Sequence, residues 1–432
     1  MKQSVKFRVL AVLLTVTLCA ATALAADSVQ SDDVVGESQG QTEVETQGDS
    51  ENLEQSESEP EPEYVPDPVG EVSFENLESR LRENNYNLLA LEENIAALEV
   101  LDYDRMEDDM RSQLNTMGNN LFKMAISGAS SSYAASSLQM AYDSLRESFE
   151  DLKDGKLQED NQALIRQLEN AQDQLVMAGQ SLYVALAGME VNHTAGERSL
   201  EALDRSVEEL QLRYDLGQVS SLTLQQTEAA RTSAISGVQT LEMNIENYKT
   251  QLEYMLGAEL TGAITLQPLP HVTQQQLEQM NLEQDLEKAK ATSYELFAAQ
   301  RTLDDAKEIF RDNIDGYTEQ TYTYKSAKHQ LQAAQYTYDA TVQNYELKFR
   351  TLYNQVKDYW QIYTAAQTAL SVEKDNYASM ALKYEQGNLS YNKFLDAKDT
   401  LSAAQDKVDN AAIDLFSAYN NYRWAVDYGI LN

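Results

Sequence analysis

Two short segments, Arg213-Tyr-Asp-Leu-Gly-Gln-Val-Ser220 and Lys383-Tyr-Glu-Gln-Gly-Asn-Leu-Ser390, align residue for residue at an offset of 170. Each follows a long helical pattern and precedes another. The glycine in each, Gly217 or Gly387, can adopt a positive φ and end a helix with a left-handed cap. The serine that closes each segment can then cap the next helix. Each segment therefore predicts a tight turn between two long antiparallel helices.

Hydrophobic periodicity before each turn supports this interpretation. Apolar residues alternate by four and three, the pattern of a coiled-coil seam. In the first copy the seam is Leu164, Leu168, Ala171, Leu175, Ala178, Leu182, Ala185 and Met189. In the second it is Tyr345, Phe349, Leu352, Val356, Tyr359, Tyr363, Ala366 and Leu370. We expect an all-α fold of duplicated long antiparallel helical hairpins, because proline, which breaks helix interiors, occurs after residue 72 only at 268 and 270.

The opening helices of the two copies also match, at a different offset. Asn85-Tyr-Asn-Leu-Leu-Ala90 resembles Ser293-Tyr-Glu-Leu-Phe-Ala298 at an offset of 208. The first copy therefore carries 38 extra residues, which we place between about Arg105 and Asp160. Shared between two arms, they would lengthen the hairpin by roughly 28 Å. The apex of this extension either packs on neighbouring subunits or touches a membrane surface.

The composition divides the chain into five parts. Residues 1–26 join a basic start, an apolar run and a small-x-small site, which predicts a signal peptide. Residues 27–72 hold fifteen Asp or Glu, no Lys or Arg and four of the six prolines, which predicts a disordered acidic linker. We place helical repeat 1 at 73–256, an inter-repeat joint at 257–273 and helical repeat 2 at 274–432.

Charge and the rarity of reactive side chains exclude several function classes. The formal net charge is −37, so the chain should repel nucleic acid and anionic headgroups. The one cysteine, Cys19, lies in the predicted signal peptide, which leaves no thiol chemistry afterwards. His193, His271 and His329 have no second ligand at metal-binding spacing, and no phosphate-binding loop or nucleophile motif occurs. We expect no metal, no cofactor and no enzyme activity.

Three features together resemble a known family. The opening Ser73-Phe-Glu-Asn-Leu77, the twice-used Tyr-x-x-Gly-x-[Val/Leu]-Ser turn and the ending Ala418-Tyr-Asn-Asn-Tyr-Arg-Trp-Ala425 resemble the TolC family of outer-membrane efflux proteins. The strongest single stretch is Tyr384-Glu-Gln-Gly-Asn-Leu-Ser-Tyr-Asn-Lys-Phe-Leu-Asp-Ala397. The resemblance covers about Ser73 to Ile430.

This resemblance implies an architecture and partners. Members of the family form homotrimers in which each protomer gives two repeats to a closed tube, or α-barrel, of antiparallel helices. The turns near 214–220 and 384–390 would be the tips of that tube. There a periplasmic adaptor (membrane fusion) protein would dock and connect the tube to an inner-membrane transporter. The residues implied at the docking tips are Gly217, Val219, Ser220, Gly387, Leu389 and Ser390.

The resemblance also implies an entrance ring just past the second turn. Asp396 stands at a position where family members place entrance carboxylates, so a trimer would set three carboxylates around the axis. Tyr384 matches a tyrosine of the same region. Lys393 stands where a second acid is expected, and Leu389 where an arginine is expected. The double acidic ring and its arginine contact are therefore not carried over.

The far ends of the hairpins differ from the family pattern. TolC proteins insert a β-hairpin there, and membrane strands need about ten alternating residues. The predicted apices near Gly128 and Gly316 offer no such run, so we expect a relative without the β-barrel insertions and doubt membrane insertion. The sequence favours an exported efflux or secretion component of the cell envelope, in the outer membrane and periplasm or in the cell-wall zone. The alternative is a structural coiled-coil surface protein that binds wall or protein partners without transport.

Overall fold

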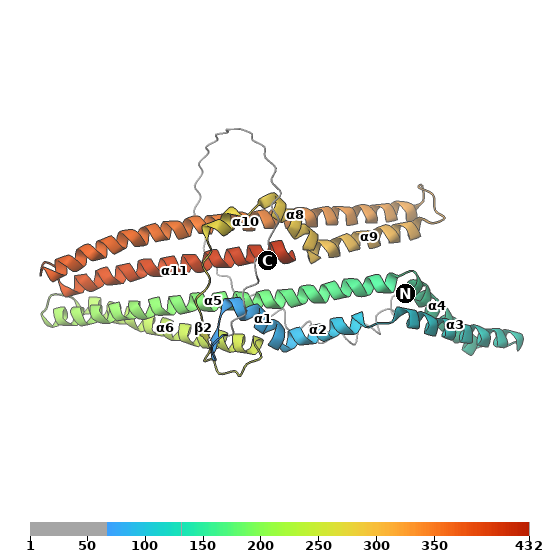
Figure 1. Ribbon diagram of the computed structural model, residues 1–432, viewed down its shortest axis with the longest axis horizontal. Helices are drawn as coiled ribbons and strands as arrows, with labels where there is room; N and C mark the ends of the chain where they lie inside the picture. Colours follow the sequence, from blue (N-terminus) through green and yellow to red (C-terminus); the bar gives the residue numbers. More distant parts are fainter. Residues whose placement is uncertain (1–66, 131, 432) are drawn as a thin grey trace, which may run out of the picture. The chain divides into compact units, whose positions relative to one another are not determined.

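The computed structural model describes residues 67–130 and 132–431, and within them the chain is almost wholly helical (Figure 1). Repeat 1 contains α1 (Phe74–Asn84), α2 (Tyr86–Glu99), α3 (Tyr103–Ile126), α4 (Tyr133–Lys153), α5 (Lys156–Asp215) and α6 (Ser221–Met255). Repeat 2 contains α7 (Gln274–Glu278), α8 (Leu282–Thr292), α9 (Tyr294–Ile314), α10 (Tyr322–Glu385) and α11 (Tyr391–Tyr428). The predicted signal peptide lies outside the described residues.

The helix boundaries repeat at the two offsets found in the sequence. The starts of α1 and α2 correspond to the starts of α8 and α9 at the larger offset, and each pair is interrupted at one residue, Asn85 or Ser293. The end of α5 corresponds to the end of α10, and the start of α6 to the start of α11, at the smaller offset. The all-α fold of duplicated antiparallel hairpins is confirmed.

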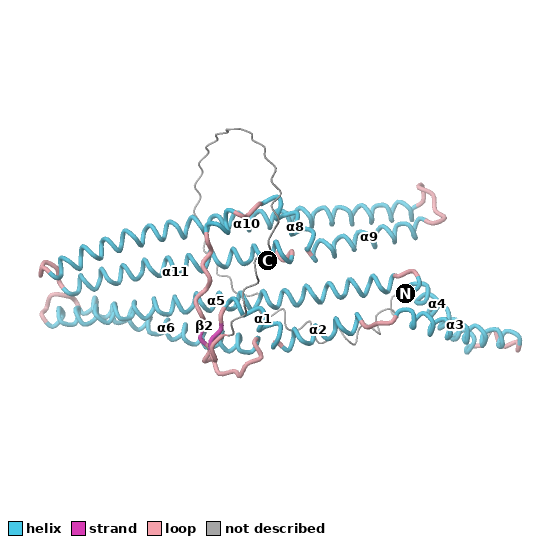
Figure 2. Tube along the Cα trace, in the orientation of Figure 1, coloured by secondary structure: helices cyan, strands magenta, loops and turns pink. Residues whose placement is uncertain are grey.

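The long helices form a single row. α5 packs on both α6 and α11, and α11 packs on both α5 and α10. The order across the row is therefore α6, α5, α11, α10, as Figure 1 shows from bottom to top. The shorter helices α1 and α2 lie on α5, while α8 and α9 lie on α11 and α10 (Figure 2).

Each interrupted helix pair is capped by a buried polar side chain. Asn85 is 2% exposed, and its Oδ1 accepts hydrogen bonds from the backbone N–H groups of Asn87 (2.9 Å) and Leu88 (3.2 Å). Its Nδ2 donates to the carbonyl of Met255 at 2.7 Å, which ties the α1–α2 junction to the end of α6. Ser293, also 2% exposed, caps α9 by accepting from the N–H of Leu296. Such caps satisfy backbone donors that would otherwise be buried without partners.

A glycine closes each repeat against this junction. Gly257 follows α6 and Gly429 follows α11, with φ of +62° and +68°. A Cβ at residue 257 would lie 2.5 Å from the carbonyl oxygen of Asn84, and one at 429 would lie 2.4 Å from the backbone of Ser293. Both positions need glycine for conformation and for space. We call this pair of contacts the glycine clasp.

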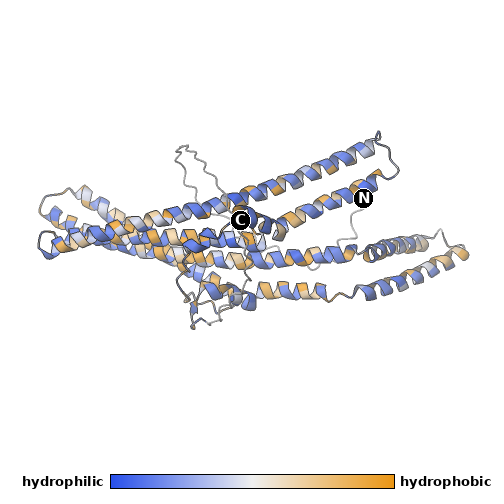
Figure 3. Ribbon diagram, turned by 45° about the horizontal axis from the view of Figure 1, so that its top comes forward, coloured by the Kyte–Doolittle hydropathy of each residue, from blue (hydrophilic) through white to orange (hydrophobic). Residues whose placement is uncertain are grey.

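The core lies near the middle of the long helices, around the clasp. One cluster of buried residues joins α1, α5 and α6 and includes Leu81, Tyr183 and Leu252. A second joins α8, α10 and α11 and includes Tyr345 and Phe349. Figure 3 shows hydrophobic and hydrophilic residues alternating along the long helices. This is the pattern that heptad spacing produces.

The prediction of a disordered linker over 27–72 is wrong for its last six residues. Residues 67–72 are described, and β1 (Glu71–Val72) pairs in parallel with β2 (Thr265–Leu266) of the inter-repeat joint. Val72 is 1% exposed, and its carbonyl lies 2.9 Å from the hydroxyl of Tyr183, which also reaches the carbonyl of Gln267. Two-residue strands are too short to show alternation, so sequence periodicity could not reveal this pairing. Residues 27–66 lie outside the described residues.

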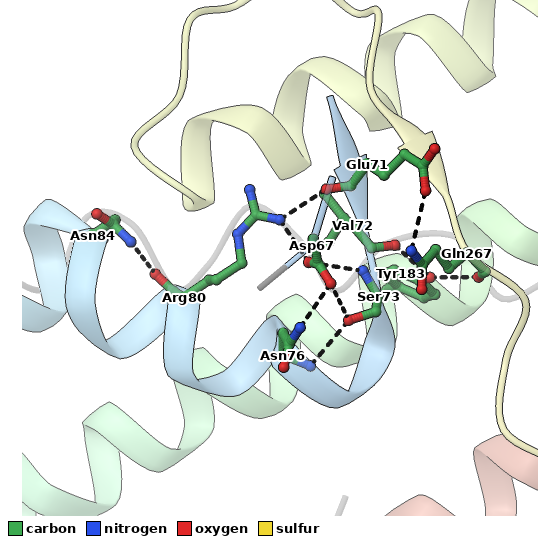
Figure 4. A network of polar contacts seen from close by, with 9 residues as sticks. All are labelled: Asp67, Glu71, Val72, Ser73, Asn76, Arg80, Asn84, Tyr183 and Gln267. Atoms are coloured by element: carbon green, nitrogen blue, oxygen red, sulfur yellow. Dashed lines mark hydrogen bonds and ion pairs between the residues drawn. The ribbon is translucent and has the colours of Figure 1, made fainter. Parts of the chain in front are cut away.

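Asp67 anchors this segment to the start of α1 (Figure 4). Its carboxylate accepts hydrogen bonds from Ser73 Oγ (2.6 Å), Asn76 Nδ2 (2.7 Å) and Arg80 Nη1 (2.8 Å). Burial alone would raise the pKa of Asp67, but these bonds and one from the Ser73 N–H lower it. By composition Asp67 is only an acidic residue between two prolines, whereas in the fold its carboxylate accepts hydrogen bonds from four donors.

Glu253 organises the inter-repeat joint in a similar way. Its side chain is fully buried at the end of α6 and accepts from the backbone N–H groups of Thr261 (2.6 Å), Gly262 (2.7 Å) and Ala263 (3.0 Å). The Thr261 hydroxyl donates as well, at 2.9 Å. Burial raises the pKa of this carboxyl group, but the four hydrogen bonds outweigh it, so the pKa is lowered.

The 38 extra residues are part of a separate short hairpin made by α3 and α4. α3 has 24 residues and α4 has 21, and the two helices pack on each other beside a connection that contains Gly128 at φ +76°. α3 holds no buried residue. The corresponding turn of repeat 2, between α9 and α10, spans 315–321. Among the described residues, no helix is both long enough and apolar enough to cross a bilayer.

Candidate docking site at the hairpin tips

Both tip turns end their helix with the same hydrogen-bonded cap. Gly217 and Gly387 have φ of +70° and +75°. In the first turn the N–H of Gly217 donates to the carbonyl of Tyr214 and that of Gln218 to Arg213, both at 2.8 Å. The second turn repeats these bonds from Gly387 to Tyr384 (2.9 Å) and from Asn388 to Lys383 (2.8 Å). This pair of bonds is the Schellman motif, which satisfies the last carbonyls of a helix.

The next helix starts immediately in both turns. Ser220 Oγ accepts from the N–H of Thr223 at 3.2 Å, and Ser390 Oγ accepts from the N–H of Lys393 at 3.4 Å. Val219 and Leu389 are half-buried beneath the turns. Each tip thus presents an exposed Gly-x dipeptide over one apolar side chain.

The structure brings the two tips to the same end of the row. Three polar pairs join α5 to α11 on the way to the tips: Arg198 with Asp406, Arg205 with Asp399, and Glu209 with Asn392. The residue number rises along α5 as it falls along α11, so the two helices run antiparallel in a single register. The ion pairs are partly exposed, and each is worth about 0–1 kcal/mol. They fix the register more than they add to stability.

This ladder of charge pairs was not predicted, although its spacing is visible in the sequence. The two arginines are seven residues apart on α5, and their partner aspartates are seven apart on α11. A heptad of cations facing a heptad of anions predicts an interhelical charge pair. The pairing could not be assigned, however, until the register of the helices was known.

The predicted entrance residues lie on both sides of the second tip turn, Tyr384 at the end of α10 and Lys393 and Asp396 at the start of α11. Tyr384 is 37% exposed and stacks on Phe394, with ring centroids 4.8 Å apart and planes 12° apart. Tyr391 lies beside it at 5.9 Å. Lys393 and Asp396 are placed on the first turns of α11, with Lys393 exposed. The aromatic group of three rings at the second tip was not predicted as a unit.

A cavity of about 400 Å³ lies where repeat 1 meets repeat 2 beside the inter-repeat joint. Its buried wall holds Gln180, whose Oε1 accepts from Asn420 Nδ2 (2.8 Å) and Trp424 Nε1 (2.7 Å). These bonds join α5 to α11 and so explain the buried amides. Among the described residues, no group of three or more His, Cys, Asp or Glu is placed to hold a metal ion.

Known structures share this arrangement of helices. No protein-family profile and no curated protein matches the sequence. Among solved structures, the outer-membrane channel OprN matches with a TM-score of 0.51 at 13% identity, over 83% of this chain and 90% of that one. The match to VceC of Vibrio cholerae covers 82% of this chain and 96% of VceC, at 12% identity and with a TM-score of 0.44. The match to CmeC of Campylobacter jejuni covers 66% of this chain and 68% of CmeC, at 17% identity and with a TM-score of 0.41. The chain therefore has the helical fold of the outer-membrane channel OprN, and the TolC-like fold that the sequence resemblance predicted is confirmed.

Proposed function

We propose that the chain is one subunit of a closed helical tube, a homotrimer, that acts as a conduit in efflux or secretion across the cell envelope. The observation that carries this proposal is the open row of four long helices. α6 and α10 form its two edges: in the described structure α6 packs chiefly on α5, and α10 packs chiefly on α11 and α9. A row with two different free edges can close only through further copies.

Both edges carry an apolar stripe on the face opposite their buried seam. On α6 the exposed residues Leu222, Met243 and Tyr254 fall within about 60° of one another at 100° per residue. On α10 the corresponding exposed residues are Tyr336, Leu347, Ile362 and Val372. The buried residues of α10, such as Tyr345 and Val356, lie on its opposite side. Apolar stripes at regular helical spacing favour a packed helix partner over solvent.

The edge of one copy would meet the other edge of the next. Such a head-to-tail contact generates a closed ring when the rotation closes. OprN is described as an outer-membrane channel, and its likeness to this chain supports a tube built from such rows. The two tips would then line one end of the tube in alternation, and an adaptor joined to an inner-membrane transporter would dock on them.

Oligomer mass tests the tube directly. Native mass spectrometry of residues 27–432 should show a trimer, and Ile362→Glu combined with Met243→Glu should give a monomer of unchanged helix content. The matched control is Leu260→Glu, which lies in the joint, away from both edge stripes, and is 60% exposed. A wild-type monomer at micromolar concentration, or a trimer that survives both glutamates, would contradict the proposal.

Docking at the tips needs a second experiment. Gln218→Glu with Asn388→Glu adds charge to both exposed turns without touching the glycines or the serine caps. Export of a substrate and recovery of the adaptor with the chain should both fall, while the trimer persists. If both survive, the tips are not the docking site. The chain would then fit a structural coiled-coil surface protein better than a conduit.

A further inference from the structure

The apex of the α3–α4 hairpin differs in charge from the rest of the chain. Residues 110–142 contain no Asp or Glu, although the whole chain has 70. The only charged residues in this range are Arg111 and Lys123, and Arg111 already pairs with Glu107 and Asp108. Residues 124–142 carry no charge at all. A hairpin end held free of acids stands out in a protein of net charge −37.

The same apex exposes large apolar side chains. Phe122 is 65% exposed and Ile126 is 73% exposed on α3, while Tyr133 is 90% and Met140 is 66% exposed on α4. None of them belongs to the half-buried seam between the two helices, which runs through residues such as Leu121 and Leu138. Both helices therefore show apolar residues outward beside their turn. Isolated exposed apolar residues are common, but four around one uncharged turn form a surface that needs a partner.

The apex of repeat 2 lacks this surface. Its turn exposes Tyr317 and Tyr322, but Asp312, Asp315 and Glu319 lie within a few residues of them. The hairpin of repeat 1 is therefore more than a longer copy of the same end. It carries the apolar surface away from the acidic body, since α3 packs chiefly on α4 and reaches α5 at its first residue, where the hydroxyl of Tyr103 accepts a hydrogen bond from Asn161 Nδ2 at 2.9 Å.

We propose that the α3–α4 apex binds the surface of a lipid bilayer, with Phe122, Ile126, Tyr133 and Met140 entering the headgroup region. The side chains are of the kind that peripheral helices bury at this depth, and Lys123 is placed to remain at the headgroups. The hairpin lies on the membrane and does not cross it. We assign the surface to lipid because the turn holds no Asp or Glu. Unlike the rest of this acidic chain, it is not repelled by the phosphate groups of lipid headgroups.

The distance from the apex to the nearest Asp or Glu determines how salt affects binding to an anionic bilayer. Along the helix axis Ile126 lies about 25 Å from Asp109 on α3 and Tyr133 lies about 15 Å from Asp143 on α4, whereas Met140 lies only about 5 Å from Asp143. The Debye length is about 8 Å at physiological ionic strength and about 30 Å at 0.01 M. The negative charge of the body is therefore screened at Ile126 and Tyr133 in physiological salt but not in dilute buffer.

Vesicle flotation of residues 27–432 tests the proposal. Vesicles of phosphatidylcholine alone should bind the chain about equally at both salt concentrations. Vesicles with an equal part of phosphatidylglycerol should bind it more strongly as salt is raised, the reverse of a cationic peripheral protein. Phe122→Ser with Ile126→Ser should lower the partition coefficient at least about tenfold on both. The matched control is Val100→Ser with Leu260→Ser, which removes two apolar residues of 82% and 60% exposure elsewhere.

A spectroscopic arm locates the contact. Phe122→Trp should shift its emission to the blue with vesicles and should be quenched by brominated phosphatidylcholine. The proposal fails if wild type does not float with either vesicle, or if the apex and control variants float alike. It also fails if salt weakens binding to anionic vesicles. Should the apex variant instead halve the particle mass without lipid, the surface is covered by a second copy and the lipid assignment is wrong.

Discussion

Replacing Gly429 by alanine tests how the glycine clasp holds repeat 2 together. Gly429 has φ +68°, where an alanine costs about 1 kcal/mol or slightly more. Its new Cβ would also lie 2.4 Å from the Cα and N of Ser293 and 2.8 Å from the carbonyl carbon of Thr292. These are backbone atoms at a helix junction, so no flexible side chain can move aside.

The cost has an upper bound set by local detachment of the segment that follows α11. Residues 429–431 could detach to relieve the overlap, and this would expose Ile430, which is 7% exposed in the fold. It would also remove the carbonyl of Gly429 from the hydroxyl of Tyr345, 3.1 Å away. Exposing the isoleucine costs about 2 kcal/mol and losing the bond about 1 kcal/mol. We expect Gly429→Ala to lower the free energy of unfolding by about 3 kcal/mol.

The matched control is Gly387→Ala at the tip. Its φ is +75°, but a Cβ there meets nothing within 4 Å among the described residues. It should cost only the conformational part, about 1 kcal/mol. Guanidinium unfolding followed by circular dichroism at one fixed protein concentration measures both, provided the two variants keep the wild-type m value. Equal losses would show that close approach at the clasp contributes nothing.

Three further predictions follow from the polar contacts. Asp67→Ala should destabilise the α1 end by about 1–3 kcal/mol, seen as faster amide exchange in β1 and the first turn of α1. Glu253→Gln should cost about 1–3 kcal/mol near pH 7, because an amide nitrogen would face backbone donors. The pKa of Glu253 is lowered in the fold, so its contribution is present above the unfolded pKa and is lost as pH falls through the folded pKa. The difference in stability between variant and wild type should therefore narrow as pH falls below the unfolded pKa. A double-mutant cycle on Arg205→Ala and Asp399→Ala should give a coupling of no more than about 1 kcal/mol that shrinks with salt.

The repeat and its turns were predictable because they depend on local chemistry. A heptad seam marks a helix, and a glycine followed three residues later by serine marks a left-handed cap and a new start. Gly217 and Gly387 therefore carry their structure in their neighbours. The need for glycine at 429 cannot be read from its neighbours in the sequence. It comes from close approach to the backbone of Ser293, which lies at the other end of repeat 2 in the sequence. Neighbouring residues could not have revealed that contact.

The same distinction explains the error at the linker. Asp67 and Glu71 belong by composition to the acidic segment, where each carboxylate would remain in water. In the fold Asp67 meets Arg80 and Asn76, and Glu71 Oε2 accepts from Gln267 Nε2 at 3.1 Å. Hydrogen-bond donors that are distant in the sequence therefore hold Asp67 and Glu71 in place, and composition gives no information about such donors. For the tips, sequence located the turns but not the Tyr384–Phe394 stack, which needs the register of α10 against α11.

The distribution of buried residues gives the strongest physical reason to expect more copies around this chain. Within the described structure, no side chain of α5 after Leu186 is buried, and neither is any of α10 after Leu370 or of α11 before Val408. The tip halves of these helices are thus one layer thick, with apolar residues half-covered on one face. A helix stabilises itself chiefly by burying such a face, and partly exposed ion pairs such as Arg205–Asp399 add little. A layer with two free edges gains the missing burial when those edges meet, and a closed ring is the arrangement that leaves none exposed.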